Sequence, residues 1–334
     1  MPVAAYAVAS DTGRRRLRNE DNYVVAPPLF AVADGMGGAQ AGEVASRLAA
    51  SALEAGDSDG LDGLERLDAL IQEANRRIYD RASSDPSASG MGTTMTVALV
   101  EGMTIAIGHV GDSRAYLVRG EQMEQLTEDH SLVNELLKSG KLSEEEAQVH
   151  PQRSVITRAV GTDPDVDVDA FTIEAEEDDI FLLCSDGLTD MVEDEEILEV
   201  VHEHRDDLDK AVRALVSAAN RGGGDDNITA VAFRVSSKAP SSLEDTVAMP
   251  ALTGDEAEPE PDEQTREYAD AASDPRADTM VVPPGEIPEE LASAEPETEP
   301  AAQPAADARR VRFVLLALLL LTVAAALIIW GLAR

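Results

Sequence analysis

Acidic residues follow runs of strand-forming residues at widely separated places in this chain. The apolar run Leu29-Phe30-Ala31-Val32-Ala33 leads into Asp34, and Phe181-Leu182-Leu183-Cys184 leads through Ser185 into Asp186. Further acids border glycines or strand-forming runs at Glu20, Asp21, Asp112 and Asp226. Mg²⁺ and Mn²⁺ prefer carboxylate, carbonyl and water oxygens as ligands. The pattern constrains the chain to a fold in which strand ends converge, and it predicts a carboxylate cage for metal ions that activate water.

Glycines follow the first of these aspartates closely. Gly35-Met36-Gly37-Gly38 lets the backbone turn tightly, so that the Asp34 carboxylate and the Gly35 carbonyl face one point. An aspartate that only caps the next helix is the alternative interpretation. A phosphate-binding loop is excluded because no Gly-Lys-Ser/Thr follows. The turn Asp225-Asp226-Asn227 is weak evidence alone, since Asp and Asn are ordinary turn residues, and it gains weight beside the other acids.

Residues 1–236 combine short apolar or alternating runs with helical periodicity, as expected of one globular domain. Strands are predicted over residues 5–9, 29–33, 94–100, 104–110, 115–118, 179–183 and 228–235. Helices are predicted over residues 42–54, 61–81, 131–139, 143–148, 194–204 and 208–220. Strand runs beside separate helix pairs indicate an α+β fold with helices outside the sheets.

Charge and cysteine content restrict the partners of this domain. The formal net charge of the 334-residue chain is −38, which argues against nucleic acid as a partner, because phosphate backbones are bound by clustered Lys and Arg. Cys184 is the only cysteine, so no intrachain disulfide can form. Its apolar neighbours predict a buried small hydrophobe and not a reactive thiol. The N-terminal segment has no signal-peptide pattern.

Two segments of different composition follow the globular domain. Residues 237–308 are rich in Pro, Glu, Asp, Ala and Ser, which predicts a disordered acidic linker. Residues 311–333 are mainly apolar and long enough to span a bilayer as a transmembrane helix. Arginines at positions 309, 310 and 312 place the preceding side in the cytoplasm. We therefore expect a single-pass protein of the cell membrane with a cytoplasmic catalytic domain and a C-terminal anchor.

The motifs of the globular domain stand in an order that resembles one family. In chain order they are Arg16-x-x-Asn19-Glu20-Asp21, Asp34-Gly35-Met36-Gly37-Gly38, Gly90-Met91-Gly92-Thr93-Thr94, Gly111-Asp112-Ser113-Arg114, Ser185-Asp186-Gly187 and Asp226-Asn227-x-Thr229. Over residues 5 to about 235 the ordered set resembles the metal-dependent serine/threonine protein phosphatases of type 2C, above all bacterial members that oppose membrane-bound kinases. The resemblance implies a four-layer αββα sandwich of two antiparallel β-sheets flanked by helices, with metals at one edge.

The resemblance also implies which residues hold two metal ions, Mn²⁺ or Mg²⁺. Asp34 bridges the two ions, and Asp186 and Asp226 complete the first site. Asp112, together with Asp186, resembles the third metal site of bacterial relatives. These aspartates, with Arg16, are the residues expected to carry catalysis.

The second metal site and the substrate site involve residues near the N-terminus. By the same resemblance the Gly35 carbonyl joins the second ion, and Glu20 or Asp21 contributes through water. Arg16 matches the arginine that binds the substrate phosphate, for which a planar guanidinium is well suited. A solvated charged turn is the alternative interpretation for Arg16 and its basic neighbours.

The implied activity is hydrolysis of phosphoserine and phosphothreonine monoesters by a metal-activated water. The expected partners are phosphorylated proteins, including Ser/Thr kinases and their substrates at the membrane, and the catalytic domain is expected to be monomeric. Three alternatives stay open. They are a catalytically weak phosphoprotein-binding regulator of the same fold, a phosphatase of an anti-sigma-type regulatory factor, and a non-catalytic membrane adaptor.

One departure from the family pattern concerns the proton donor. Eukaryotic relatives often carry His at the position of Met36, and Met cannot protonate a leaving alcohol. His109, His130 and His150 are other candidate acids, although each is more often structural. Residues 128–160 are expected to form a mobile flap near the cleft that contributes to substrate selection.

Two threonines in the linker share a local pattern. Asp245-Thr246-Val247-Ala248-Met249-Pro250 and Asp278-Thr279-Met280-Val281-Val282-Pro283 each place an acid before Thr and apolar residues with Pro after it. We expect Thr246 and Thr279 to be regulatory phosphorylation sites for a partner kinase. Chance similarity in a low-complexity segment is the alternative.

Overall fold

The structure is a computed structural model. It describes residues 2–37, 41–56, 61, 63–143, 146–147 and 150–237, and the backbone of 280–281. All of these residues belong to one compact unit, Met1–Ala292. Most of the linker, both of its threonines and the predicted transmembrane segment 311–333 lie outside the described residues.

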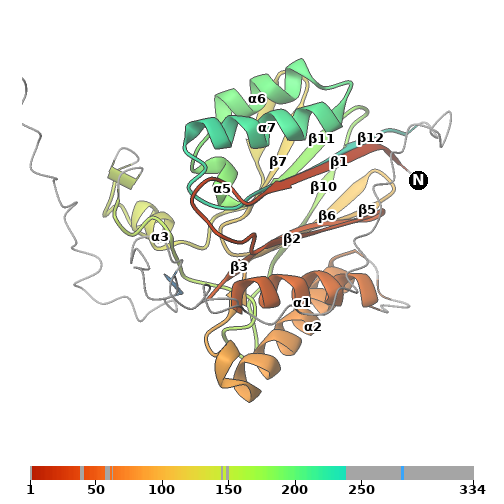
Figure 1. The fold of residues 1–334 in the computed structure, drawn as a ribbon. Coiled ribbons are helices and arrows are strands. Elements are labelled where there is room, and N and C mark those ends of the chain that lie inside the picture. The colour runs from red at the N-terminus through yellow and green to blue at the C-terminus, as the bar shows by residue number, and fades with distance from the viewer. Residues whose placement is uncertain are drawn as a thin grey trace, which may run out of the picture. The chain divides into compact units, whose positions relative to one another are not determined.

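Two antiparallel β-sheets form the centre of the domain (Figure 1). The first has the order β1 (Val3–Asp11), β12 (Ile228–Val235), β11 (Ile180–Cys184), β7 (Arg114–Arg119) and β8 (Gln122–Gln125). The second has the order β10 (Asp169–Glu174), β6 (Thr104–Val110), β5 (Met95–Glu101), β3 (Leu29–Met36) and β2 (Asp21–Ala26), and β4 (Gly92–Thr93) pairs with β3. The predicted α+β fold with two antiparallel sheets is therefore confirmed.

Helices cover the outer face of each sheet (Figure 1). The second sheet packs against α1 (Ala41–Ala55) and α2 (Gly63–Ser84). The first packs against α6 (Asp194–Glu203) and α7 (Leu208–Gly222), and the short α5 (Asp186–Thr189) follows β11. The apolar face of α7, with Leu208, Val212 and Leu215, is buried on the sheet, as its helical spacing predicts.

The space between the sheets is filled by aromatic and aliphatic side chains. Phe233 stacks on Phe30 with ring centroids 4.4 Å apart and on Phe181 at 5.1 Å. Residues 29–33 of β3 are buried on both faces, because the strand lies between helices and the opposite sheet. This explains why β3 reads as a continuous apolar run and not as an alternating one. Cys184 is buried, as expected.

The smaller elements complete the described chain. They are a 3₁₀ helix at Pro86–Ala88, α3 (Leu132–Lys138), β9 (Val155–Ile156) and β13 (Met280–Val281), which pairs parallel with β9. The predicted helix 131–139 corresponds to α3, with Ser131 as N-cap and Ser139 as C-cap. Of the predicted helix 143–148, residues 146 and 147 are helical. No helix among the described residues is both long and apolar enough to cross a bilayer.

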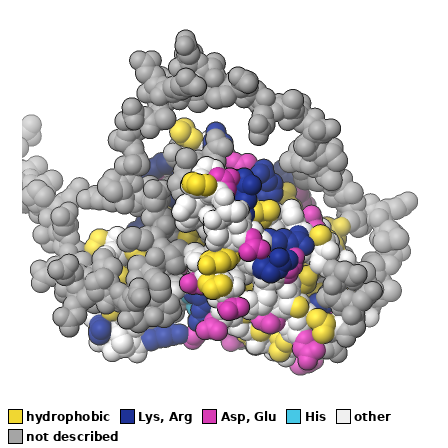
Figure 2. Space-filling model, turned by 90° about the horizontal axis from the view of Figure 1, so that it is seen from below, with side chains coloured by type: hydrophobic (Ala, Val, Ile, Leu, Met, Phe, Trp, Pro, Cys, Tyr) yellow, Lys and Arg dark blue, Asp and Glu magenta, His cyan; other side chains and the backbone are white. Residues whose placement is uncertain are grey.

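Acidic and basic side chains are mixed on the outer helical face. Figure 2 views the molecule from the side of α1 and α2, and Lys and Arg side chains lie there beside Asp and Glu. Ion pairs such as Arg77 Nε to Glu73 Oε1 at 2.7 Å account for part of this mixture. Charges of both signs therefore lie side by side on this face.

Candidate metal centre

Aspartates from four different strand ends meet at one place in the domain. Asp34 lies near the end of β3, and the register of β2 with β3 pairs it directly with Asp21. Asp186 opens α5 just after β11, and Asp226 lies just before β12. The pKa of the Asp34 carboxyl group is raised by the negative charges of four neighbouring acids, Asp21, Asp186, Asp226 and Asp112. The structure thus brings together the acids that the strand-end pattern predicted.

Burial makes this cluster electrostatically costly. It raises the pKa of Asp34 and Asp186 well above the ordinary range, and the neighbouring carboxylates raise both further. Burial also raises the pKa of Asp21 to about 6, although hydrogen bonds from Thr229 and Ser185 oppose the shift. A buried carboxylate with a raised pKa is stabilised by a nearby cation. The cluster is therefore an environment that favours positively charged ligands.

Ser185 connects two parts of the cluster. Its hydroxyl donates to Asp21 Oδ2 at 2.8 Å and accepts the Thr229 amide at 2.9 Å. Residue 185 is fully buried between β11 and α5. It holds the start of β2 against β12 and so fixes the distance between the acids that these strands carry.

The Gly35 carbonyl and the Glu20 carboxylate both lie against the first turn of α1. A Cβ atom at Gly42 would stand 2.6 Å from Gly35 O and 2.9 Å from Glu20 Oε2. A Cβ atom at Gly35 would stand 2.1 Å from the Gly42 carbonyl oxygen. Glycine is required at both positions because nothing larger fits this approach of helix to strand. These two oxygen donors are placed together, as expected for a second ion.

Arg16 reaches the same cluster from the loop after β1. Its Nη2 donates to Asp226 Oδ2 at 2.7 Å, and both side chains are about one quarter exposed. Burial lowers the pKa of Arg16, but the attraction of Asp226, with those of Asp34 and Asp186, raises it on balance. Arg16 is therefore a fixed cation at the edge of a negative cluster.

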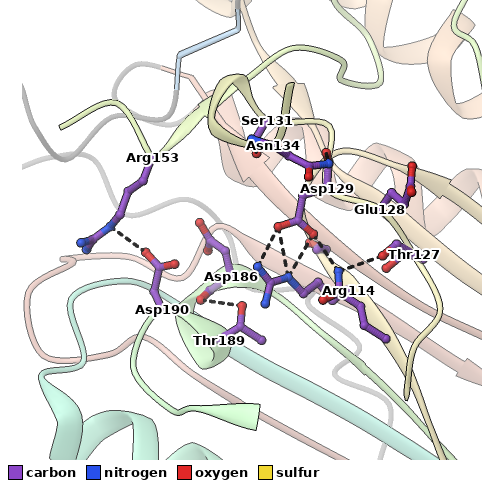
Figure 3. A network of polar contacts seen from close by, with 12 residues as sticks. Arg114, Thr127, Glu128, Asp129, Ser131, Asn134, Arg153, Asp186, Thr189 and Asp190 are labelled. Atoms are coloured by element: carbon purple, nitrogen blue, oxygen red, sulfur yellow. Dashed lines mark hydrogen bonds and ion pairs between the residues drawn. The ribbon is translucent and has the colours of Figure 1, made fainter. Parts of the chain in front are cut away.

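Asp112 lies near a further acid, Asp190, that was not among the residues singled out from the sequence. Burial raises the pKa of Asp112 to about 7, with the charges of Asp129 and Asp190 adding to the shift. Figure 3 shows Asp186 between Asp190 on one side and Arg114 with Asp129 on the other. The negative charges of Asp112 and Asp190 both raise the pKa of the Asp186 carboxyl group. Asp190 belongs to the acidic cluster, although no motif or strand pattern marks it in the sequence.

A salt bridge anchors the loop that carries Asp112. Arg114 donates from Nη2 to Asp129 Oδ2 at 2.7 Å and from Nε to Asp129 Oδ1 at 3.0 Å (Figure 3). Arg114 also donates to the Tyr116 hydroxyl at 3.2 Å, and Tyr116 donates to Asp194. This bidentate pair ties the start of β7 to the segment that leads into α3.

The segment 128–160 borders the cluster. Arg153 Nε lies 3.4 Å from Asp190 Oδ2 (Figure 3), and residues 93 and 160 form an isolated bridge. The amide of Thr157 donates to the His130 carbonyl at 2.7 Å. The segment therefore lies where a flap was expected, whereas its mobility stays a prediction.

The buried oxygen donors are of the chemical type that hard divalent cations prefer. Asp21 Oδ1 and Asp186 Oδ1 are buried and have no hydrogen-bond partner among the described residues. Such oxygens suit coordination, because an unpaired buried carboxylate oxygen is costly. In the part of the chain that is described, no three His, Cys, Asp or Glu side chains surround a common point closely enough to hold an ion. The two oxygens of Asp226 accept hydrogen bonds from Arg16 Nη2 and from the Asn227 amide.

Each histidine named as a candidate acid makes hydrogen bonds within the domain. His109 is fully buried between Thr96 and the Glu128 carbonyl, and burial lowers its pKa to about 4. His130 accepts the Gly111 amide and contacts Asp169 and Arg158. His150 accepts the Gln152 amide through Nδ1. These contacts support the structural interpretation.

Met36 packs in an apolar cluster with Ile156 and Ala159. Its side chain is buried and carries no titratable proton. It therefore offers no replacement for the histidine that stands at this position in eukaryotic relatives.

Comparisons with known proteins agree with this geometry. Residues 14–229 match the model of the family described as protein phosphatase 2C. Serine/threonine protein phosphatase PstP of Mycobacterium tuberculosis is 43% identical over 231 residues, which are 69% of this chain and 44% of that relative. The chain therefore spans less than half the length of this relative. Serine/threonine phosphatase stp of Listeria innocua is 42% identical over 231 residues, which are 66% of this chain and 91% of that protein.

Solved structures are similar in fold as well as sequence. The crystal structure of the M. tuberculosis serine/threonine phosphatase PstP/Ppp superposes with a TM-score of 0.66 at 42% identity, over 70% of this chain and 99% of that one. The PstP catalytic domain in complex with two manganese ions gives a TM-score of 0.65 at 40% identity, over 70% of this chain and 99% of that one.

Proposed function

The chain belongs to the protein phosphatase 2C family, and from this membership we propose that it is a metal-dependent protein-serine/threonine phosphatase. The observation that carries the proposal is the convergence of Asp34, Asp21, Asp186, Asp226 and Asp112 in one buried cluster. Relatives at about 40% identity bear the names of serine/threonine protein phosphatases. The reaction we propose is hydrolysis of phosphoserine and phosphothreonine monoesters on proteins.

We assign the resident cofactor as two Mn²⁺ or Mg²⁺ ions. Asp34, Asp186 and Asp226 would hold the first ion, and Asp34 with the Gly35 carbonyl and Glu20 or Asp21 the second. Asp112, Asp186 and the neighbouring Asp190 form the acidic group for a third. When bound, the ions supply positive charge that lowers the pKa of water and offsets charge on the phosphoryl oxygens.

The residues of the chain bind and orient the phosphate. Arg16 is held by Asp226 at 2.7 Å, so its guanidinium is positioned before the substrate arrives. A planar guanidinium can donate two parallel hydrogen bonds to phosphoryl oxygens. The leaving alcohol needs a proton, and Met36 supplies none. In our proposal that proton comes from water, because the histidines near the site are engaged in structural contacts.

Metal-dependent turnover tests this function. The full chain is treated with EDTA and then assayed with Mn²⁺, Mg²⁺ or no metal on p-nitrophenyl phosphate and on phosphothreonine peptides. We expect turnover only after a divalent cation is added back. Equal activity with and without metal would contradict the proposed function, as would the absence of turnover in every condition.

We propose further that the enzyme acts at the cell membrane and opposes Ser/Thr kinases there. The support is the apolar segment 311–333, which follows Arg309 and Arg310, has Arg312 at its start and is joined to the domain by a long acidic linker. Tethering would raise the effective concentration of the domain near membrane-bound partners. The substitutions Leu319→Arg and Leu320→Arg should move the protein from the membrane fraction to the soluble fraction. An unchanged distribution would contradict the anchor.

Phosphorylation of the linker is a separate proposal. Thr246 and Thr279 share an acid on one side and apolar residues with proline on the other. Mass spectrometry after incubation with a cognate kinase should detect phosphate at both threonines. Phosphate at neither would end the proposal.

A further inference from the structure

The loop between β1 and β2 carries one apolar side chain that stands in the solvent beside the acidic cluster. Leu17 is 96% exposed, whereas the other large exposed hydrophobic residues of the described chain, Tyr23 and Leu61, are 40% and 41% exposed. Leu17 directly follows Arg16, the arginine assigned to the substrate phosphate. An isolated exposed leucine is ordinary on a protein surface.

A single asparagine side chain holds this loop in shape. Asn227 Nδ2 donates to the Thr12 carbonyl at 2.9 Å and to the Arg18 carbonyl at 2.8 Å. Its Oδ1 accepts the Glu20 amide at 2.7 Å. Asn227 is buried and directly follows Asp226, so the two ends of the loop are tied to the acidic cluster itself. The loop is therefore a rigid platform and not a free surface turn.

Backbone contacts fix the middle of the loop as well. The Arg14 amide donates to the Gly224 carbonyl at 2.7 Å. Gly13 has a φ of +78°, and a Cβ atom there would lie 2.1 Å from the Asp226 carbonyl oxygen. Only glycine combines this conformation with this approach. The backbone that leads to Arg16 and Leu17 is thus packed directly on the turn that carries Asp226.

The arginines around Leu17 turn back toward the protein. Arg15 Nε lies 2.9 Å from Asp225 Oδ1, and Arg16 Nη2 lies 2.7 Å from Asp226 Oδ2. Arg18 Nη1 is 3.8 Å from Glu43 Oε2. The Leu17 side chain, by contrast, is 96% exposed. A rigid loop that presents an apolar side chain next to a phosphate-binding arginine has the features of a substrate contact.

We propose that Leu17 is a specificity-determining residue that contacts the substrate side chain next to the phosphorylated residue. Neighbouring Cα atoms are about 3.8 Å apart in any chain. In our proposal the phosphate is held at Arg16, and the substrate residue beside the phosphorylated one packs on Leu17. An apolar substrate side chain there would remove Leu17 from water, which is favourable. The preferred substrates are phosphopeptides with an apolar residue adjacent to phosphothreonine or phosphoserine.

The inference rests on the proposed phosphatase function and is tested with the full chain and Mn²⁺. Two phosphothreonine peptides differ only in having Leu or Ser on both sides of the phosphothreonine. The wild-type protein should show a higher kcat/KM for the Leu peptide. In Leu17→Ala the ratio of the two kcat/KM values should fall by roughly tenfold, the low end of the range for an apolar contact. The exposed Leu61→Ala is the matched control and should keep the wild-type ratio.

p-Nitrophenyl phosphate separates the outcomes, because it has no residue beside its phosphate. A peptide ratio that is the same in wild type and Leu17→Ala would overturn the role of Leu17. So would an equal loss on both peptides and on p-nitrophenyl phosphate, because that loss would mean that the substitution disturbs the metal centre. Failure of the wild-type protein to hydrolyse any of the three compounds would instead contradict the phosphatase function.

Discussion

The interior between the two sheets and the acidic cluster are built by the same three strands. β3, β11 and β12 contribute Phe30, Phe181 and Phe233 to the interior, where the rings stack at 4.4 and 5.1 Å. At or just beyond one end, the same strands carry Asp34, Asp186 and Asp226. The rings attract one another and exclude water. The carboxylates repel one another and are held in place against that repulsion.

This contrast indicates how the domain divides its tasks. Burial of each phenylalanine contributes roughly 1.5–3 kcal/mol to folding. Burial of the carboxylates opposes folding until a cation or a proton neutralises them, as the raised pKa values of Asp34 and Asp186 show. Burial of apolar side chains in the interior stabilises the fold. Part of that stabilisation is offset by the free-energy cost of holding the carboxylates close together. Substitutions in the two regions should therefore have opposite effects on stability.

The largest effect on turnover is expected at the cluster. Asp34→Asn should lower kcat/KM for p-nitrophenyl phosphate by roughly 100- to 1,000-fold or more, because it removes the charge shared by both ions. The same substitution should raise the unfolding temperature of the EDTA-treated protein, because one of several repelling carboxylates is gone. Steady-state kinetics and thermal unfolding measure the two effects.

Asp206→Asn is the control for this substitution, since the Asp206 side chain is 99% exposed. It should leave both turnover and unfolding temperature close to the wild-type values. If Asp34→Asn kept normal activity, Asp34 would not be a metal ligand.

The largest effect on stability is expected in the interior. Phe233→Ala should lower the free energy of unfolding by roughly 3–5 kcal/mol, because the cavity would lie between two stacked rings. Activity per folded molecule should change little. Urea unfolding measures the loss, and Tyr23→Ala on the partly exposed β2 should cost less than about 1 kcal/mol. A similar cost for both variants would mean that the stacked rings are not the main support of the sheets.

A smaller effect on kinetics is expected from Arg16, the residue proposed to bind the substrate phosphate. Arg16→Ala should raise KM for p-nitrophenyl phosphate by roughly 10- to 100-fold, because a charge-assisted pair of hydrogen bonds to phosphate is lost. The kcat value should fall less than KM rises. An unchanged KM would count against the phosphate-binding role of Arg16.

The smallest expected effect is the change of protein stability with pH in the absence of metal. The pKa of Asp21 is raised to about 6 and that of Asp112 to about 7, so both hold protons more tightly in the folded state than in the unfolded state. Their contribution to stability is complete below the unfolded value near 4 and is lost as pH rises through 6 to 7. EDTA-treated protein should therefore unfold roughly 3–8 °C higher at pH 5 than at pH 8.

Asp112→Asn provides the control for the pH effect. In that variant the difference between pH 5 and pH 8 should shrink, because one of the buried carboxyl groups with a raised pKa is absent. A wild-type protein that is more stable at pH 8 than at pH 5 without metal would contradict the raised pKa values.

The sequence predicted the central strands better than the outer ones. β3, β6 and β12 were predicted because each is a long run of apolar residues buried on both faces. β2 and β10 were missed because polar and charged residues occupy their partly exposed positions. A strand at the edge of a sheet needs fewer apolar residues, so its pattern resembles that of a loop.

In the acidic cluster, too, residues with a local sequence pattern were predicted and residues without one were missed. Asp34 and Asp186 were found because an apolar strand leads into each of them. Asp190 was missed because it joins the cluster only through the turn of α5 that follows Asp186. The hydrogen bonds by which the Asn227 side chain holds the β1–β2 loop were also missed. Their three partners are more than 200 residues away in the chain. Contacts of this kind depend on the folded topology and leave no local signal.

The most direct test of this account is calorimetric titration of the EDTA-treated full chain with Mn²⁺. We expect binding of at least two ions and, at pH 6, release of protons from carboxyl groups whose pKa values are raised. In Asp34→Asn the binding should be much weaker at both sites, since Asp34 is shared between them. Absence of binding in the wild-type protein, or equal binding in wild type and Asp34→Asn, would contradict the account.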